Sequence, residues 1–374
     1  KMRSTFVGLS LLLLQSVLTA PILRPQDTFG ILATWVPPAP WFLWDMPMVS
    51  PDGNSIYMLV VSPEFSANRS GIFKVDPVTL KSVGDVLEFH GAVDNFRVLN
   101  DTRAYAYSQN TATDMTLTPI DLAAWKLLPN ISLPPRSPVE DGCSLHYAVN
   151  SIASLIFVSA LPNWFSYLQF DLASRQWVGN YTETAGMGYH FHPTKPTMYY
   201  MIEGEISSCS VYEVLFPEHP KPIDVGAPSV PWPISRTLHN DICLEATMAF
   251  LDDGVSVLIA DGGHSSLFKR RIARVEIVDL VSFTVTTPVQ SLPDSCKSMG
   301  IVGASANAKY AYFAADNMWQ TEHALYRVPL SPLDCANTDI MPLPETETYE
   351  QTPGPVAGKS YAYTLFNQSL VQLS

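Results

Sequence analysis

Charged residues are scarce in this sequence, and positively charged residues are scarcer than negative ones. Asp, Glu, Lys and Arg make up 15% of the 374 residues, and 22 Lys and Arg stand against 35 Asp and Glu, which gives a net charge of −13. Globular proteins typically carry about 25% charged residues. Nucleic-acid binding requires a basic face that meets the phosphates, so this composition argues against nucleic acid as a partner.

The sequence also lacks the short motifs that mark several enzyme and cofactor classes. It contains no CxxC pair, no GxSxG nucleophile elbow, no P-loop and no dinucleotide-binding fingerprint. The acidic segments Asp252–Gly254 and Ala260–Gly263 lack the regular spacing of a calcium loop and are typical of turns. We therefore expect neither a cofactor nor a metal site.

Long apolar runs are missing except near the start of the chain. Lys1 and Arg3 precede the apolar run Phe6–Leu14, and the small residues Thr19 and Ala20 follow it. This order predicts a secretory signal peptide over residues 1–20, because the run is too short to span a bilayer. No later stretch is apolar enough for a span, so we expect a secreted, extracellular protein without a membrane span.

Glycosylation sequons and cysteines fit an extracellular location. The five Asn-x-Ser/Thr sequons predict N-glycosylation; they are at Asn68, Asn100, Asn130, Asn180 and Asn367. Five cysteines are compatible with two disulfides and one free thiol. The candidates nearest in sequence are Cys209 with Cys243 and Cys296 with Cys335, although spacing alone does not fix the connectivity.

A unit of about 50 residues recurs along the chain, as in β-propeller blades. Each copy has an apolar strand, a turn, an aromatic-rich strand, a strand with period-two alternation, a D-x-x-T/S/A segment and a last strand. The copies begin near Met48, Phe96, Tyr147, Gly188, Met248, Ile301 and Lys359, and the last is cut short. The sequence thus predicts an all-β fold, a single seven-bladed propeller of four-stranded antiparallel blades over residues 26–374. The segment Phe29–Val36 would close the ring as the outer strand of the last blade, whereas two separate β-domains are the alternative.

Polar residues recur where the chain enters the innermost strands, at positions that converge in a propeller. This predicts a ligand-binding face built from His90, Arg97, His190, His192, His239 and Glu245. The "HFH" pair, His190 and His192, has the spacing of two metal ligands on one side of a strand. No third ligand is identifiable, and a histidine that caps the following turn is the other interpretation.

The stretch "FHPTKPTMYYMIEGEISSCSVYEV" resembles the blade signature of the lactonase-type seven-bladed propellers, which include 6-phosphogluconolactonase-like hydrolases and carboxymuconate cyclases. The matching elements are Phe191–Pro193, Met198–Tyr199, Glu203 and Ser210–Tyr212. The resemblance implies His146 and Glu203 as catalytic residues, a general acid and base. The family's arginines are missing, since Met187 occupies one of their positions, and little is left to hold an anionic substrate.

Export signals, a complete ring and the missing arginines together favour a binding or structural role over catalysis. We therefore expect a secreted, N-glycosylated propeller that binds an extracellular protein or glycan, or other copies of itself in an assembly. The alternative is a secreted lactonase- or cyclase-type hydrolase or lyase that uses His146 and Glu203.

Overall fold

The structure is a computed structural model of the chain. It describes residues 29–45, 47–62, 69–111, 114–134, 143–149, 153–161, 164–182, 187–203, 209–224, 228–240, 247–261, 274–292, 299–317, 323–343, 356–366 and 368–374. The expected signal peptide lies outside these residues. Within them, no helix has the length and apolar character needed to cross a bilayer.

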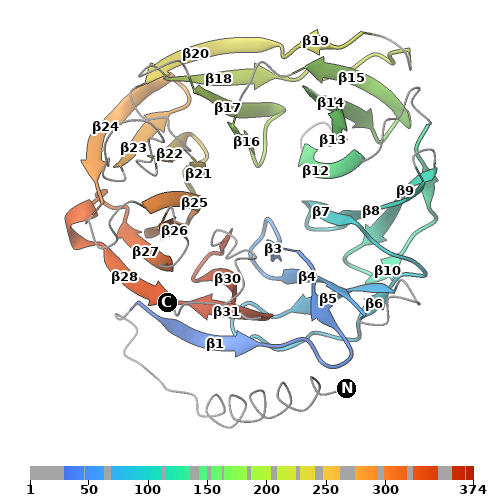
Figure 1. Cartoon of the computed structure of the whole chain (residues 1–374), viewed down its shortest axis with the longest axis horizontal. Coiled ribbons are helices and arrows are strands. Elements are labelled where there is room, and N and C mark those ends of the chain that lie inside the picture. The colour runs from blue at the N-terminus through green and yellow to red at the C-terminus, as the bar shows by residue number, and fades with distance from the viewer. Residues whose placement is uncertain are drawn as a thin grey trace, which may run out of the picture.

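The described strands form seven sheets arranged as blades in a ring (Figure 1). The innermost strands surround the central axis, where propellers have their channel. Blades 1 and 2 contain β2 (Phe42–Leu43), β3 (Met48–Val49), β4 (Ile56–Val61), β5 (Ser70–Val75) and β6 (Leu87–Glu88), then β7 (Asn95–Asn100), β8 (Arg103–Thr111), β9 (Asp114–Asp121), β10 (Lys126–Leu127) and β11 (Ile131–Ser132). Blades 3 and 4 contain β12 (Cys143–Val149), β13 (Ser154–Leu161), β14 (Trp164–Asp171), β15 (Gln176–Thr182) and the added strand β19 (Val230–Pro231), then β16 (Met187–Phe191), β17 (Thr197–Glu203), β18 (Cys209–Leu215) and β20 (Ile234–Asn240).

The remaining blades have the same four-stranded plan. Blade 5 contains β21 (Thr247–Phe250), β22 (Ser256–Asp261), β23 (Arg274–Asp279) and β24 (Thr284–Ser291). Blade 6 contains β25 (Met299–Ala306), β26 (Tyr310–Asn317), β27 (His323–Pro329) and β28 (Asp339–Leu343), with a short 3-10 helix at Cys335–Asn337. Blade 7 contains β29 (Val356–Ala357), β30 (Ala362–Phe366), β31 (Ser369–Leu373) and, from the other end of the chain, β1 (Ile31–Trp35). The seven-bladed all-β fold predicted from the repeat is confirmed.

The two ends of the described chain close the ring, as the truncated last repeat predicted. Strand β1 pairs antiparallel with β31, with Ile31 opposite Leu373 and Trp35 opposite Leu370. The Gly30 N–H donates to Ser374 Oγ at 2.9 Å, and the Ser374 N–H donates to the Gly30 carbonyl at 3.1 Å. Figure 1 shows β1 as the outermost strand beside β31. The pairing removes an open sheet edge that would otherwise be free to pair with another chain.

The D-x-x-T/S/A segment of the repeat is a capped turn between the third and fourth strands. Asp76 Oδ1 accepts from the Thr79 N–H at 2.7 Å, and Asp279 Oδ1 accepts from the Ser282 N–H at 2.6 Å. Asp121 and Asp171 cap their turns in the same way. The residue that follows each turn has a positive φ; these residues are Leu80, Trp125, Arg175 and Phe283. A type I turn followed by a left-handed residue is a common hairpin connection, so the recurring Asp sets the blade geometry locally.

Apolar side chains from neighbouring blades form the core. A buried cluster lies at each of the seven interfaces between adjacent blades in the described chain. At the interface of blades 7 and 1, Trp35 packs edge-on against Phe73 with ring centroids 5.5 Å apart. Each blade thus buries both of its faces. This explains why its strands carry apolar and aromatic residues on both sides.

The structure corrects one expectation about the cysteines. Cys335 is 2% exposed and carries a free thiol, so the candidate pair with Cys296, which the spacing had left open, is not formed here. Burial raises the pKa of this thiol to about 12, which keeps it protonated and unreactive at neutral pH. Cys243 and Cys296 lie outside the described residues, and Cys143 and Cys209 are described only as backbone positions in β12 and β18.

Burial separates the sequons into two kinds. Asn100 and Asn130 are exposed, whereas Asn180 is 6% exposed in the middle of β15, opposite Leu168. A bulky glycan on a side chain buried between strands is incompatible with this fold. We therefore expect no glycan at Asn180; Asn68 and Asn367 lie outside the described residues.

We predict that Asn100 and Asn130 carry glycans and Asn180 does not when the full chain is made in a eukaryotic secretory host. Glycosidase treatment in heavy-oxygen water, followed by peptide mass spectrometry, marks each occupied asparagine. Asn100→Gln and Asn130→Gln should each reduce the apparent mass by one glycan, and Asn180→Gln should leave it unchanged. A glycan found on Asn180 would contradict the packing of β15.

Candidate functional site

The polar residues expected at the ligand-binding face do not gather at one end of the channel: His90 precedes the innermost strand β7, whereas His190 and His192 lie at the end of β16 and in the turn after it. His90 is exposed in the loop before β7. Arg97 is in β7, the innermost strand of blade 2, where its guanidinium donates to the Phe96 carbonyl at 2.6 Å and lies 3.3 Å from Asp45 Oδ2 of blade 1. Arg97 and Asp45 are both half-buried, so the pair ties two blades together near the channel. This ion pair, rather than a free cation, is what the structure places there.

His192 caps the turn that follows β16. Its Nδ1 accepts from the N–H groups of Thr194 and Lys195, both at 3.1 Å, so Nε2 carries the proton and donates to the Gly254 carbonyl at 3.3 Å. The ring is 2% exposed, and its burial lowers its pKa. With both nitrogens engaged, His192 is not a metal ligand in this arrangement. The turn-capping interpretation of the "HFH" pair is correct for this member.

His190 connects blade 4 to blade 5 from the innermost strands. Its Nε2 accepts from the Met248 N–H of β21 at 3.3 Å. The ring is partly buried, and burial lowers its pKa to about 4. His190 is therefore neutral at physiological pH and serves as an acceptor for the backbone of the next blade.

We predict that acidification between pH 6.5 and 4 destabilises the protein through His190. The pKa of an unfolded histidine is 6.5 and that of folded His190 is about 4, so the unfolded state binds more protons in this window and stability falls with pH. The difference corresponds to about 3 kcal/mol, reduced to about 2 kcal/mol because the ring is partly exposed to water.

The measurement is urea unfolding at pH 7 and pH 4.5. His190→Gln keeps an acceptor for the Met248 N–H and should flatten most of the slope, leaving the smaller contribution of His192. An unchanged slope in His190→Gln would show that His190 is not neutral in the fold. The lowered pKa values of Asp52, Asp76 and Asp279 act only below their unfolded values near 4, outside this window.

A buried carboxylate strengthens the same interface from the outer strands. Glu213 in β18 accepts from Arg236 Nε at 2.8 Å, from a second Arg236 nitrogen, and from Ser235 Oγ at 2.6 Å. Burial by itself would raise the Glu213 pKa, but the hydrogen bonds from Arg236 and Ser235 hold it below its ordinary value. Arg236 also donates to the Leu280 and Val281 carbonyls of blade 5, at 2.7 and 3.0 Å. These groups hold blades 4 and 5 together and offer no open reactive site.

The proposed catalytic residues are described only as backbone positions. His146 is in β12 at a bulge between Leu145 and Tyr147, and Glu203 ends β17 opposite Cys209. His239 lies in β20, the outermost strand of blade 4, rather than at the entry to an innermost strand of blade 5. Glu245 lies outside the described residues.

A cleft lies on the outer side of blades 3 and 4, away from the channel. It is made by an excursion of the chain between β18 and β20, residues 216–233, which leaves blade 4 and crosses to blade 3. There β19 pairs in parallel with β15, and the Ile223 N–H donates to the Trp177 carbonyl at 2.9 Å. The two ends of the excursion meet again where the Leu215 N–H donates to the Pro233 carbonyl at 3.3 Å. In the described chain, this is the one place where a blade lends a strand to its neighbour.

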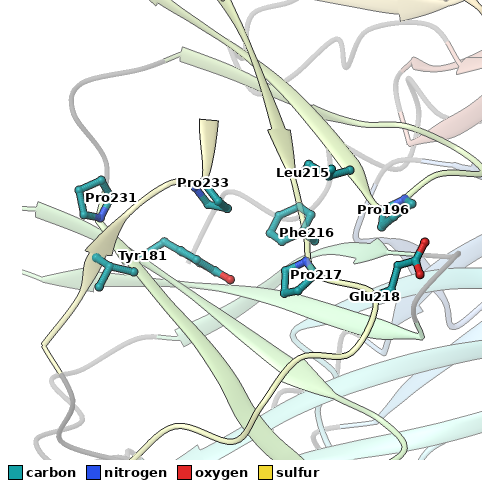
Figure 2. A pocket seen from close by; sticks show the side chains of 9 residues that line it. Tyr181, Pro196, Leu215, Phe216, Pro217, Glu218, Pro231 and Pro233 are labelled. Atoms are coloured by element: carbon teal, nitrogen blue, oxygen red, sulfur yellow. The ribbon is translucent and has the colours of Figure 1, made fainter. Parts of the chain in front are cut away.

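The cleft has a volume of about 540 Å³ and a mainly apolar lining. Figure 2 shows its side chains converging from β15, the end of β18 and the two ends of the excursion. The lining residues are Tyr181, Pro196, Leu215, Phe216, Pro217, Glu218, Val230, Pro231 and Pro233. Glu218 is the charged residue of this set and lies at one end of the cleft, beside Pro217 (Figure 2).

The sequence-based reasoning missed this cleft because it followed the repeat. The signal was the interruption of the repeat, a segment with six prolines between Phe216 and Ile234. Proline fixes φ and contributes no N–H, so such a segment cannot continue a ladder and is stiff without one. The interruption of the repeat, more than the repeat itself, marks the place where the surface of this propeller departs from the regular blade pattern.

Comparisons with known proteins identify the fold. No family model matches the chain, and no curated protein sequence matches it. Similar solved structures include the β-propeller domain of the trilobed protease from Pyrococcus furiosus, at 11% identity and a TM-score of 0.53 over 89% of this chain and 92% of that one. That domain has an open velcro topology, whereas β1 and β31 pair here.

Two further structures lead to the same result. An uncharacterized protein from Listeria monocytogenes has 9% identity and a TM-score of 0.53, over 87% of this chain and 90% of that one. The acylaminoacyl peptidase of Pyrococcus horikoshii has 10% identity and a TM-score of 0.51, over 88% of this chain and 52% of that one. At these identities the likeness concerns architecture alone, and this chain is a seven-bladed β-propeller.

Proposed function

We propose that this protein is an exported, N-glycosylated β-propeller that serves as a binding module for an extracellular protein or glycan. The observation that carries the proposal is the cleft made by residues 216–233, a concave apolar surface on the outside of the ring. Pockets of about 300–1,000 Å³ that are mostly apolar with few polar groups are typical of ligand sites. The leader-like N-terminus and the exposed sequons Asn100 and Asn130 support the extracellular setting.

The polar residues near the channel support binding over catalysis. Arg97 is paired with Asp45, and His190 and His192 accept from backbone N–H groups of the turn and of the next blade. These side chains hold the ring together, and a catalytic acid or base needs a proton-accepting atom that is open to substrate. The channel-side residues described here therefore have structural roles.

The proposal is tested with the full chain secreted from a eukaryotic host. The protein should appear in the medium with a mass that glycosidase reduces. Purified and immobilised, it should retain a defined glycan on a glycan array or a defined protein from extracellular-matrix extract, with saturable binding that free protein competes away. Retention of the chain inside the cell, or no saturable binding in either format, would contradict the proposal.

A lactonase- or cyclase-type activity is the second candidate. It is favoured by the backbone positions of His146 and Glu203, which lie in the adjacent blades 3 and 4; Glu203 ends β17 two residues after Met201, which is opposite Met187 at the start of β16. Lactone hydrolysis by the wild-type chain, compared with Glu203→Gln and His146→Gln, tests it. Loss of hydrolysis in both variants, with unchanged thermal unfolding, would favour the enzyme; equal or absent rates would remove it.

A further inference from the structure

We propose that the cleft between blades 3 and 4 binds an extended apolar segment of a partner protein, one that contains proline and has a Lys or Arg beside its apolar residues. This inference rests on the proposed binding function and names the class of partner. It is carried by the shape and rigidity of the apolar cleft and by one charge at its end.

The walls of the cleft are apolar and stiff. Leu215 and Val230 are 52% and 51% exposed, and Ile234 directly after the excursion is 44% exposed. Large aliphatic side chains left this open at one place mark interaction surfaces. Pro217, Pro231 and Pro233 fix the backbone on either side of them, so little conformational freedom remains to be lost on binding.

A preassembled aromatic cluster lies behind the cleft. Trp232, between Pro231 and Pro233, stacks on Tyr181 with ring centroids 4.5 Å apart and meets Phe216 edge-on at 5.9 Å. Pro231 and Pro233, on either side of Trp232 in the sequence, both line the cleft. The buried Nε1–H of Trp232 finds no acceptor among the described residues. Tyr181 and Phe216 are 6% and 1% exposed, so the cluster holds the walls of the cleft rigid.

The negative charge at one end of the cleft favours a partner segment with a positive charge. Glu218 is exposed at one end, and the other lining residues are uncharged. The whole chain has a net charge of −13, which adds to the attraction of a basic segment. An apolar lining with a single carboxylate has few groups for sugar hydroxyls, so the surface favours a peptide over a glycan. A proline-containing segment is already extended, so it loses little conformational freedom when it docks on a stiff apolar cleft.

The test pans a phage-displayed library of random 12-residue peptides against the immobilised full-length protein. Enriched peptides should share apolar residues and proline next to Lys or Arg. The best peptide, synthesised with a fluorescent label, should bind to Leu215→Asp with a Kd at least tenfold weaker than to the wild type. Glu218→Lys should weaken binding of the basic peptide at least fivefold. It should strengthen binding of a version of the peptide in which Glu replaces the basic residue.

Val281→Asp is the matched control, because Val281 is 67% exposed on blade 5, outside the cleft. It should leave the Kd unchanged, and all variants should unfold at the wild-type urea midpoint. No enrichment, or equal binding to Leu215→Asp and to the wild type, would overturn the inference. If panning yields no peptide while glycan or matrix-protein binding persists, the peptide site is contradicted and the proposed binding function is retained. If neither kind of binding is found, both proposals are contradicted.

Discussion

Trp35→Ala should lower the free energy of unfolding by about 3–5 kcal/mol, the range for removing a buried tryptophan. Trp35 is 6% exposed in the strand that closes the ring, and it packs against Phe73 of blade 1. Its Nε1–H donates to Ser82 Oγ at 3.0 Å. The substitution leaves a cavity at the interface of blades 7 and 1 and weakens the hold of a terminal strand.

The neighbouring residue gives the control for this experiment. Val36 is 59% exposed, so Val36→Ala should change the free energy of unfolding by less than about 0.5 kcal/mol. Urea unfolding followed by far-ultraviolet circular dichroism measures both variants. In Trp35→Ala, limited proteolysis should also cut within residues 31–36 sooner, because β1 separates from β31 more often. Equal midpoints for the two variants would show that β1 does not close the ring.

Arg236→Ala should lower the free energy of unfolding by about 3 kcal/mol at pH 7. The change leaves the Glu213 carboxylate, whose side chain is 10% exposed, without its guanidinium and frees two carbonyls of blade 5. Removing one member of a buried pair costs about 3–5 kcal/mol, and we take the lower end because Arg236 is itself 37% exposed. The ring of Phe283, 4.6 Å below the guanidinium, loses a cation–π contact as well.

The pH dependence of the variant separates this cause from simple loss of packing. Without Arg236, burial raises the Glu213 pKa above its unfolded value, so the folded variant takes up a proton as the pH falls and recovers stability. The deficit relative to wild type should therefore shrink between pH 7 and pH 5. Glu213→Gln combined with Arg236→Ala should cost less than the sum of the single changes.

An exposed ion pair provides the comparison. Arg69 and Glu88 are 50% and 42% exposed, so Arg69→Ala should cost less than about 1 kcal/mol. A deficit of similar size in Arg69→Ala and Arg236→Ala, or one independent of pH, would contradict the role given to Glu213.

Several features of the fold could be predicted because their causes are local. The Asp of D-x-x-T/S/A caps its own turn through hydrogen bonds that span two or three residues, so four blades show the same segment in the sequence. The turns at Gly53 and Gly254 have positive φ, as their Asp-Gly sequences indicate. Ring closure by Phe29–Val36 was predictable because a truncated final repeat leaves one strand missing.

Other features depend on contacts that the sequence does not display. Asn180 reads as a sequon but is buried by the strand opposite it, and Cys335 reads as a disulfide partner but is enclosed without one. The partners of His190 and His192, Met248 and Gly254, are 58 and 62 residues away. The cleft needs residues 216–233 to cross from blade 4 to blade 3, a path that no periodicity specifies.

The sequence by itself determined the repeat, the strand alternation, the turns and the number of blades, because each depends on interactions within about 50 residues. Only the tertiary structure decided which polar groups form hydrogen bonds between blades and where an open apolar surface remains. Burial and hydrogen-bond satisfaction are properties of the packed ring, and residues far apart in the chain supply them together. The "HFH" pair shows the difference: its spacing was visible in the sequence, but its role in joining blades 4 and 5 came from packing.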